Sequence, residues 1–144
     1  MDELDRRIVE LLRRNGRMSS SDIGKEIHLS VPAVTERIRK LEQQGVIEQF
    51  TVRLNPKALG RYCTVFILVN VQGYEETEQF RRAIIQSEYV LECNHIAGEY
   101  DYLLKVALPD IEALEHFISR TLKATYGVIR TNTIFSLSQL KADL

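Results

Sequence analysis

The stretch Met18–Val46 constrains the fold of this chain more than any other part of the sequence. It contains two short segments with helical spacing of apolar residues, separated by a tight turn at Leu29-Ser30. Ser19 is placed to cap the first helix and Ser30 the second, because a serine hydroxyl accepts a hydrogen bond from a free N–H group of the first helical turn. Gly45 is the expected end of the second helix. Two short helices joined in this way predict a helix-turn-helix.

The second of these predicted helices has the size and the side chains to bind DNA. An α-helix fits the major groove, where the residues of its N-terminal part meet base edges. Small or polar side chains there can approach the bases, and basic side chains farther along attract phosphates whatever the sequence. An ordinary helical hairpin with a solvated, charged face is the alternative. The candidate base-contacting residues are Ser30, Val31, Ala33, Thr35 and Glu36, and the candidate phosphate-contacting residues are Arg37, Arg39 and Lys40.

The net charge of −1 conceals a difference between the two ends of the chain. Residues 1–60 hold 11 Lys and Arg against 9 Asp and Glu, a net charge of +2, whereas residues 61–144 hold 8 against 11, a net charge of −3. This asymmetry is modest, but its sign agrees with DNA binding confined to the N-terminal part.

Other features of the composition limit the function classes. No apolar run approaches the length of a membrane span and the N-terminus is acidic, so we expect no membrane segment or signal peptide, and a cytoplasmic location. Cys63 and Cys93 lie in apolar stretches and are expected to be buried free thiols rather than a disulfide or metal pair. No metal-ligand spacing is present, and we expect no metal or cofactor.

The segments on either side of the helix pair complete a predicted winged helix-turn-helix. Residues 2–14 have the spacing of a helix that packs across the pair. Residues 46–54 alternate roughly as a strand, as the wing would. Arg53 in this strand is a candidate contact to the DNA backbone, with a plain surface arginine as the alternative. Because an Asn-Pro pair and a glycine follow, the predicted domains are residues 1–54 and 62–144, with a linker at 55–61.

Beyond the linker, the pattern changes to two helical segments among four β-type segments. The order βαββαβ predicts a ferredoxin-like domain, a four-stranded antiparallel sheet with two helices on one face, so the chain as a whole is α+β. The run Val65–Val69 is apolar on both faces of its strand, which predicts that a second copy covers the open face in a homodimer. The predicted strands are 61–71, 90–97, 102–108 and 128–137, and the predicted helices are 74–86 and 110–122.

The ordered set of motifs resembles the Lrp/AsnC (feast/famine) transcription regulators over nearly the whole chain. In that family the second domain mediates dimerisation and effector sensing, dimers often assemble into tetramers or octamers, and the effector is usually an amino acid bound between dimers. The resemblance therefore implies duplex DNA, an amino acid and further copies of the chain as partners. The matching segments are 4–8, 16–19, 29–34, 37–42, 45–47, 97–104 and 131–135.

The candidate effector site is the turn at Gly98, Glu99, Tyr100 and Asp101. An amino acid needs a carboxylate to accept from its ammonium group, which Asp101 or Glu99 supplies, and a glycine permits close approach of the backbone. The alternative is that Gly98 makes a hairpin and Asp101 caps it. The resemblance adds Thr131, Thr133 and Ser136 on the last predicted strand as candidates to line the same cleft.

Three other functions are weighed against an effector-responsive regulator. The first is an effector-independent, architectural protein that wraps DNA. The second is an RNA-recognition module, which has the same βαββαβ order, but the two carboxylates beside Tyr100 and Tyr102 would repel phosphate. The third is an enzyme, for which the sequence offers no catalytic grouping or phosphate-binding glycine loop. We expect no enzymatic activity.

Overall fold

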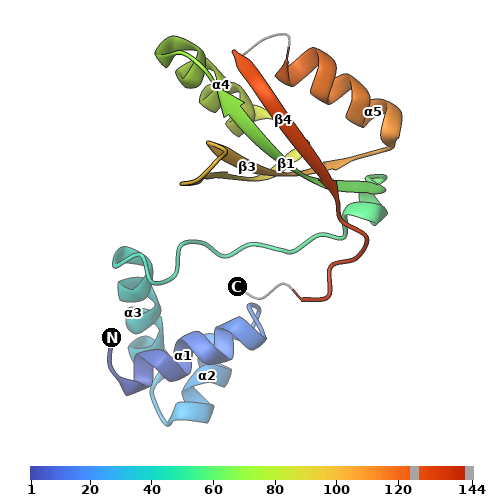
Figure 1. Ribbon diagram of the computed structural model, residues 1–144. Coiled ribbons are helices and arrows are strands. Elements are labelled where there is room, and N and C mark those ends of the chain that lie inside the picture. The colour runs from blue at the N-terminus through green and yellow to red at the C-terminus, as the bar shows by residue number, and fades with distance from the viewer. Residues whose placement is uncertain (124–126, 142–144) are drawn as a thin grey trace. The chain divides into compact units, whose positions relative to one another are not determined.

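The computed structural model describes residues 1–123 and 127–141. The chain divides into two compact units, one spanning Met1–Arg53 and the other beginning at Leu54 (Figure 1). Short segments connect the elements within each unit, and the 3₁₀ helix Pro56–Leu59 lies in the predicted linker, where the Asn55 side chain accepts from the N–H of Lys57. Among the described residues, no helix has both the length and the hydropathy needed to cross a membrane.

The first unit consists of three helices, α1 (Glu3–Arg14), α2 (Ser20–Ile27) and α3 (Val31–Gln43). Its helix caps are the predicted ones: the side chains of Ser19 and Ser30 accept from backbone N–H groups of α2 and α3, and Gly45 takes a positive φ of 68° after α3. The apolar faces of the three helices meet in one core, whose members are Ile8, Ile23, Ile27, Val34 and Leu41.

The predicted wing strand at residues 46–54 is wrong. The structure has no strand between α3 and the 3₁₀ helix, and Phe50, Val52 and Leu54 are exposed. An isolated alternating segment gains nothing from an extended conformation unless a neighbouring strand accepts its hydrogen bonds. Within this chain no described segment pairs with residues 46–54. The alternation of apolar and polar residues was therefore not enough for this segment to form a strand.

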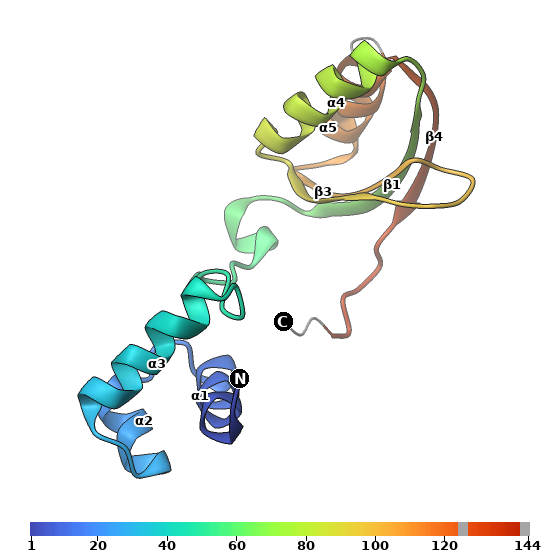
Figure 2. The same cartoon turned by 90° about the vertical axis from the view of Figure 1, so that its left-hand side faces the viewer.

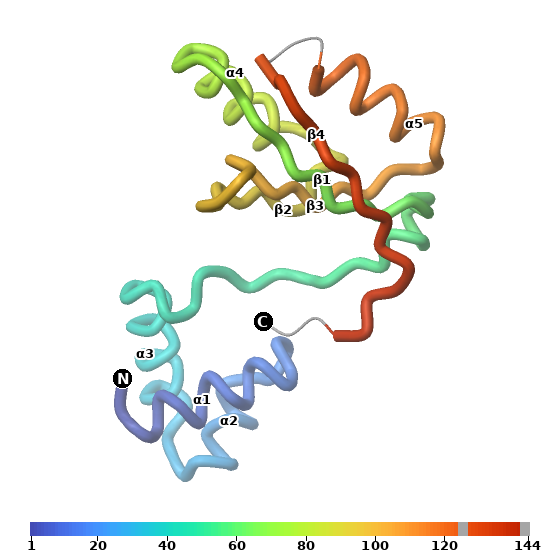
Figure 3. The backbone as a smooth tube through the Cα atoms, in the orientation of Figure 1, coloured from blue at the N-terminus to red at the C-terminus, as the bar shows by residue number. Residues whose placement is uncertain are grey.

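The second unit has the predicted ferredoxin-like order. Its strands form one antiparallel sheet in the spatial order β2-β3-β1-β4, with β2 and β4 at the edges (Figure 3). Figure 2 shows α4 and α5 on the same face of this sheet. The bounds are β1 Cys63–Val71, α4 Tyr74–Gln86, β2 Val90–His95, β3 Tyr102–Leu108, α5 Ile111–His116, a π-helical segment Phe117–Leu122, and β4 Val128–Phe135.

The core of the second unit lies between the helices and one face of the sheet. Val65, Ile67 and Val69 alternate on the helix-covered face of β1 and are fully buried together with Phe80 of α4. The intervening Phe66 and Leu68 face the other side and are only partly buried. This open face also carries Leu103, Ala107 and Ile134, which the strand registers place beside the β1 residues.

Two details of the second unit differ from the predictions. The helix predicted over 110–122 is an α-helix only to His116 and then widens into the π-helical segment. Both cysteines are free, but only Cys63 is buried, where burial raises the pKa of its thiol. Cys93 is exposed because β2 is an edge strand, so the prediction of two buried thiols is wrong for that residue.

Candidate nucleic-acid interface and effector region

Helix α3 is held by local features at its N-terminus. The Ser30 hydroxyl accepts from the N–H of Ala33 at 3.4 Å, and Pro32 occupies the first turn, where an N–H group has no helical partner. The turn that precedes α3 depends on two residues that the sequence reasoning missed. His28 ends α2 in the left-handed conformation with φ 57°, and the Gly24 carbonyl accepts from the N–H of Leu29 at 2.9 Å.

Gly24 allows the turn to approach α2 closely. A Cβ on this residue would lie 2.5 Å from the carbonyl oxygen of Leu29 and 3.7 Å from a methyl group of Val34. The signal was present in the sequence, since a glycine stood inside a helical pattern between Ile23 and Ile27. It follows that Gly24 helps to set the position of α3 against α2.

The exposed surface of α3 carries most of the candidate DNA-contacting residues. Ser30, Val31, Thr35 and Glu36 are exposed, as are Arg39 and Lys40, while Ala33 and Arg37 are partly buried. Arg53 is exposed in the segment after the helix. The Thr35 hydroxyl donates to the Val31 carbonyl at 3.0 Å and lies 3.2 Å from the Ser20 hydroxyl of α2. Apart from the N-cap Ser30 and Arg53, the predicted residues thus lie on one helix.

Arg37 has partners within its own unit. Its guanidinium donates to the carboxylates of Asp2 and Asp5, each at 2.7 Å, and its side chain is 29% exposed. The same two carboxylates form the capping box of α1. The hydrogen bonds that Arg37 donates to Asp2 and then to Asp5 raise the pKa of Arg37. The hydrogen bonds that Asp2 accepts from the N–H of Asp5 and then from Arg37 lower the pKa of Asp2. These contacts tie α3 to the start of α1.

Glu36 pairs with the two other basic residues of α3. Both of its carboxylate oxygens accept from Arg39, at 2.8 Å from Nε and 2.6 Å from Nη2. Lys40 Nζ lies 3.9 Å from the same carboxylate. The hydrogen bond from Arg39 lowers the pKa of Glu36, and the same bond raises the pKa of Arg39. Each of the three basic residues of α3 that were expected to meet phosphate therefore lies beside a carboxylate in the free protein.

The second candidate region is the turn between β2 and β3. Gly98 has φ 149° with open space where a Cβ would stand. The Asp101 carboxylate accepts from the N–H of Val71 at 3.0 Å, and its backbone N–H donates to the Val69 carbonyl at 3.1 Å. Asp101 therefore holds the turn against the end of β1, a structural role different from the hairpin cap considered for it in the sequence.

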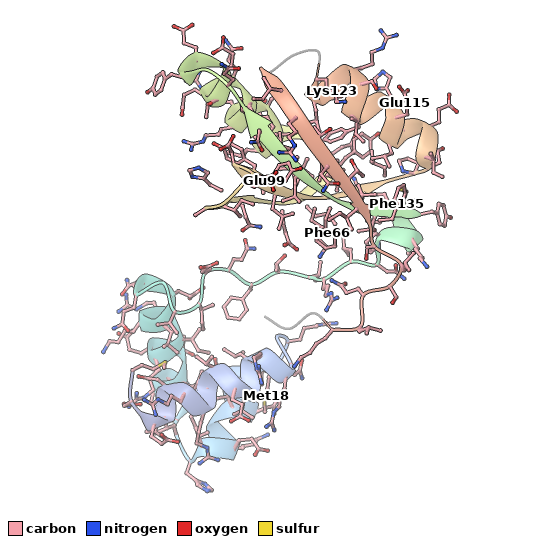
Figure 4. All side chains as sticks on the ribbon, viewed as in Figure 1. Met18, Phe66, Glu99, Glu115, Lys123 and Phe135 are labelled. Atoms are coloured by element: carbon pink, nitrogen blue, oxygen red, sulfur yellow. The ribbon has the colours of Figure 1, made fainter. Side chains whose placement is uncertain are left out.

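A polar cluster beside this turn includes two residues that the sequence reasoning missed. Arg130 of β4 donates to the Glu99 carboxylate at 2.6 Å and lies over the Tyr100 ring, 4.7 Å from its centroid. The hydrogen bond to Glu99 raises the pKa of Arg130. Asn70 donates to the Glu99 carbonyl at 2.9 Å, while its own Oδ1 is buried without a hydrogen-bond partner. Figure 4 labels Glu99 at this end of the sheet.

The family resemblance also suggested Thr131, Thr133 and Ser136 as effector-binding residues. These three residues do not gather at this turn. Thr131 and Thr133 pair with the buried Val69 and Ile67, which places them on the helix-covered face. Ser136 donates its N–H to the Thr64 carbonyl at the opposite end of β1. At roughly 3.3 Å per strand residue, that end is about 20 Å from Arg130. Within one copy of the chain, these residues and the turn do not form a single site.

No metal site is evident in the part of the chain that the structure describes. Residues 1–123 and 127–141 contain no group of three or more His, Cys, Asp and Glu side chains arranged to hold an ion. In both candidate regions, carboxylates pair with arginine side chains.

A helix-turn-helix with a basic second helix, followed by an α+β domain, defines a two-domain DNA-binding transcriptional regulator. The sequence matches the AsnC-type helix-turn-helix domain over residues 1–42 and the Lrp/AsnC ligand binding domain over residues 64–144. The chain belongs to the Lrp/AsnC family of transcriptional regulators. The predicted family and the predicted α+β fold class are thereby confirmed.

The similarity to individual proteins extends over the whole chain. The leucine-responsive regulatory protein of Escherichia coli K12 is 36% identical over 143 residues, which are 98% of this chain and 87% of that protein. A Neisseria meningitidis transcriptional regulator in complex with L-methionine is 28% identical, with a TM-score of 0.93 over 99% of this chain and 94% of its own. LrpC of Bacillus subtilis is 32% identical, with a TM-score of 0.86 over 99% of both chains.

Proposed function

We propose that this regulator binds duplex DNA by inserting the N-terminal half of α3 into the major groove. Ser30, Val31, Ala33, Thr35 and Glu36 then face base edges, and Arg39, Lys40 and Arg53 contact phosphates. The observation that carries this proposal is the exposed first turn of α3, which is capped by Ser30 and holds no side chain larger than valine. Arg37 is assigned a positioning role, because its guanidinium is bound by Asp2 and Asp5.

The first test measures the affinity of the full chain for DNA as a function of salt. A duplex selected from a random library is compared with an unselected random duplex. Arg39→Ala should lower the salt slope by about one unit on the selected duplex, because one phosphate contact is lost. Thr35→Ala should change the preference between the two duplexes with an unchanged slope. An unaltered slope in Arg39→Ala, or equal losses on both duplexes in Thr35→Ala, would remove these residues from the interface.

We further propose that an amino acid binds beside the turn at Gly98. Arg130 is suited to its carboxylate, and Glu99 to its ammonium group, because the two side chains already form a charge pair of this polarity. The buried Asn70 Oδ1 is an acceptor that lacks a donor, which a bound ammonium group would supply. The similarity to a methionine-bound regulator and to leucine-responsive proteins supports an amino acid over other small molecules.

The test of this proposal is thermal unfolding of the full chain with each amino acid at millimolar concentration. A ligand that binds only the folded state raises Tm by mass action. Glu99→Gln should abolish the shift, whereas Glu92→Gln, a charge change on the neighbouring strand, should retain it. No shift with any amino acid would favour the effector-independent, architectural alternative, in which the ion pair of Glu99 and Arg130 only fixes the turn.

We propose that the protein acts as a homo-oligomer and that it regulates transcription rather than catalysing a reaction. The open, apolar face of the sheet supports association of two copies through the second domain, and such dimers can assemble further into tetramers or octamers. The proposed domains are residues 1–54 and 62–144 with a linker at 55–61, close to the division at Arg53. Because a regulator of this kind works on chromosomal DNA, the proposed location is the cytoplasm.

A further inference from the structure

The recognition helix carries an acidic residue at the centre of its exposed face. At 100° per residue, Glu36 lies nearly opposite the buried Val34 and Leu41, in line with Pro32 one turn earlier. Its carboxylate accepts two hydrogen bonds from Arg39 and lies 3.9 Å from Lys40 Nζ. A surface that faces a polyanion therefore presents a negative charge at its middle, bound to its own cations.

Because of these ion pairs, a phosphate group can bind Arg39 only in exchange for the Glu36 carboxylate. A phosphate oxygen that binds Arg39 must replace the Glu36 carboxylate, since the guanidinium presents Nε and Nη2 to both carboxylate oxygens. Lys40 approaches the same carboxylate, so both cations that follow Glu36 on this face are affected. Once displaced, Glu36 stands in the groove as an unpaired charge unless a donor on a base edge replaces Arg39. The amino group of cytosine is the base-edge donor that suits a carboxylate in the major groove.

We propose that Glu36 is a specificity-determining residue, which competes with phosphate for Arg39 and Lys40 and releases them without penalty only where a cytosine amino group meets its carboxylate. On duplexes that lack this cytosine, Glu36 keeps Arg39 and Lys40 away from phosphate, and binding is weak. The helix thus rejects non-cognate DNA by means of its own ion pairs. This inference rests on the proposed insertion of α3 into the major groove.

The experiment compares Glu36→Gln with Glu42→Gln in the full chain. Both substitutions remove one negative charge from an exposed position of α3, but Glu42 is not among the carboxylates that pair with Arg39 or Lys40 in the described structure. The probes are a duplex selected by the wild-type protein from a random library and an unselected random duplex. Affinities are measured by fluorescence anisotropy over a range of salt concentrations, and Tm is measured for each variant.

Glu36→Gln should bind the random duplex about tenfold more tightly than wild type, with a salt slope steeper by about one unit for each released cation. Its ratio of selected to random affinity should fall at least about tenfold, and a repeated selection should lose a preferred C·G base pair. Glu42→Gln should keep the wild-type ratio. Because a gain in affinity is expected, misfolding cannot imitate the result.

One outcome would contradict the role of Glu36, and a different outcome would contradict the insertion of α3 on which it rests. If Glu36→Gln and Glu42→Gln alter both duplexes by the same factor, Glu36 acts only through net charge and the inference fails. If wild type prefers no duplex and Arg39→Ala leaves the salt slope unchanged, the insertion of α3 itself is wrong.

Discussion

At His28 the backbone takes a left-handed conformation with φ 57°, which residues that have a Cβ atom rarely adopt. This residue ends α2 and begins the turn into α3, where glycine would be unstrained. His28→Gly should therefore raise the free energy of unfolding by about 0.5–1 kcal/mol, measured by urea unfolding of the full chain. His28→Ala keeps the Cβ and should give no gain. An equal gain in both variants would show that the strain is not in the backbone.

At Gly24, unlike His28, the observed structure requires that there be no side chain. Its Cβ would lie 2.5 Å from the Leu29 carbonyl oxygen, so Gly24→Ala must displace the turn that leads into α3. We expect a loss of about 1–3 kcal/mol in the free energy of unfolding and weaker binding to every duplex. Gly16→Ala is the matched control, because a Cβ there would meet only the Leu12 carbonyl oxygen at 3.8 Å. Comparable losses in both variants would refute the steric explanation.

At the scale of elements, the contacts between Arg37 and α1 couple two helices distant in sequence. Arg37→Ala should lower the Tm of the full chain and weaken DNA binding through a less well placed α3, without the decrease in salt slope expected for Arg39→Ala. Arg37→Lys should restore part of the Tm because it keeps the charge. A salt slope lowered by about one unit in Arg37→Ala would instead make Arg37 a phosphate contact, as its place in the sequence first suggested.

The same contacts predict the response to acid. Because the pKa of Asp2 is lowered from 3.8 in the folded state, its stabilising contribution is complete above pH 3.8 and is lost as the pH falls through the lowered value. Asp2→Asn should therefore lower Tm at neutral pH, and the difference from wild type should shrink below pH 3.8. Thermal unfolding at several pH values measures this. Glu26→Gln, outside the cluster around Arg37, should show no such convergence; a constant difference for Asp2→Asn would contradict the assignment.

For the molecule as a whole, we expect the largely apolar open face of the sheet to mediate assembly. Phe66 lies near its centre, between Lys105 of β3 and Ile134 of β4, and points away from the helices (Figure 4). We expect a dimer or larger oligomer in sedimentation equilibrium at micromolar concentration, and a dissociation constant raised about thirtyfold or more by Phe66→Asp. Tyr74→Asp, at an exposed position of α4, should leave assembly unchanged. A wild-type monomer would contradict the predicted dimer.

The helices with local signals in the sequence could be predicted from it. Capping serines, a proline in the first turn and a terminal glycine mark α2 and α3, and apolar spacing predicted α4 over the residues that form it. These signals suffice because helical hydrogen bonds and caps join residues at most a few positions apart.

Features that depend on residues far apart in the chain were visible only once the fold was known. Arg37 meets carboxylates 32 and 35 positions away, and Asn70 lies beside Arg130 through the pairing of β1 with β4. The alternation in 46–54 predicted a strand that found no neighbour in this chain. Strand partners, ion pairs and the two faces of a sheet are set by register and packing, which the order of residues along one segment does not specify.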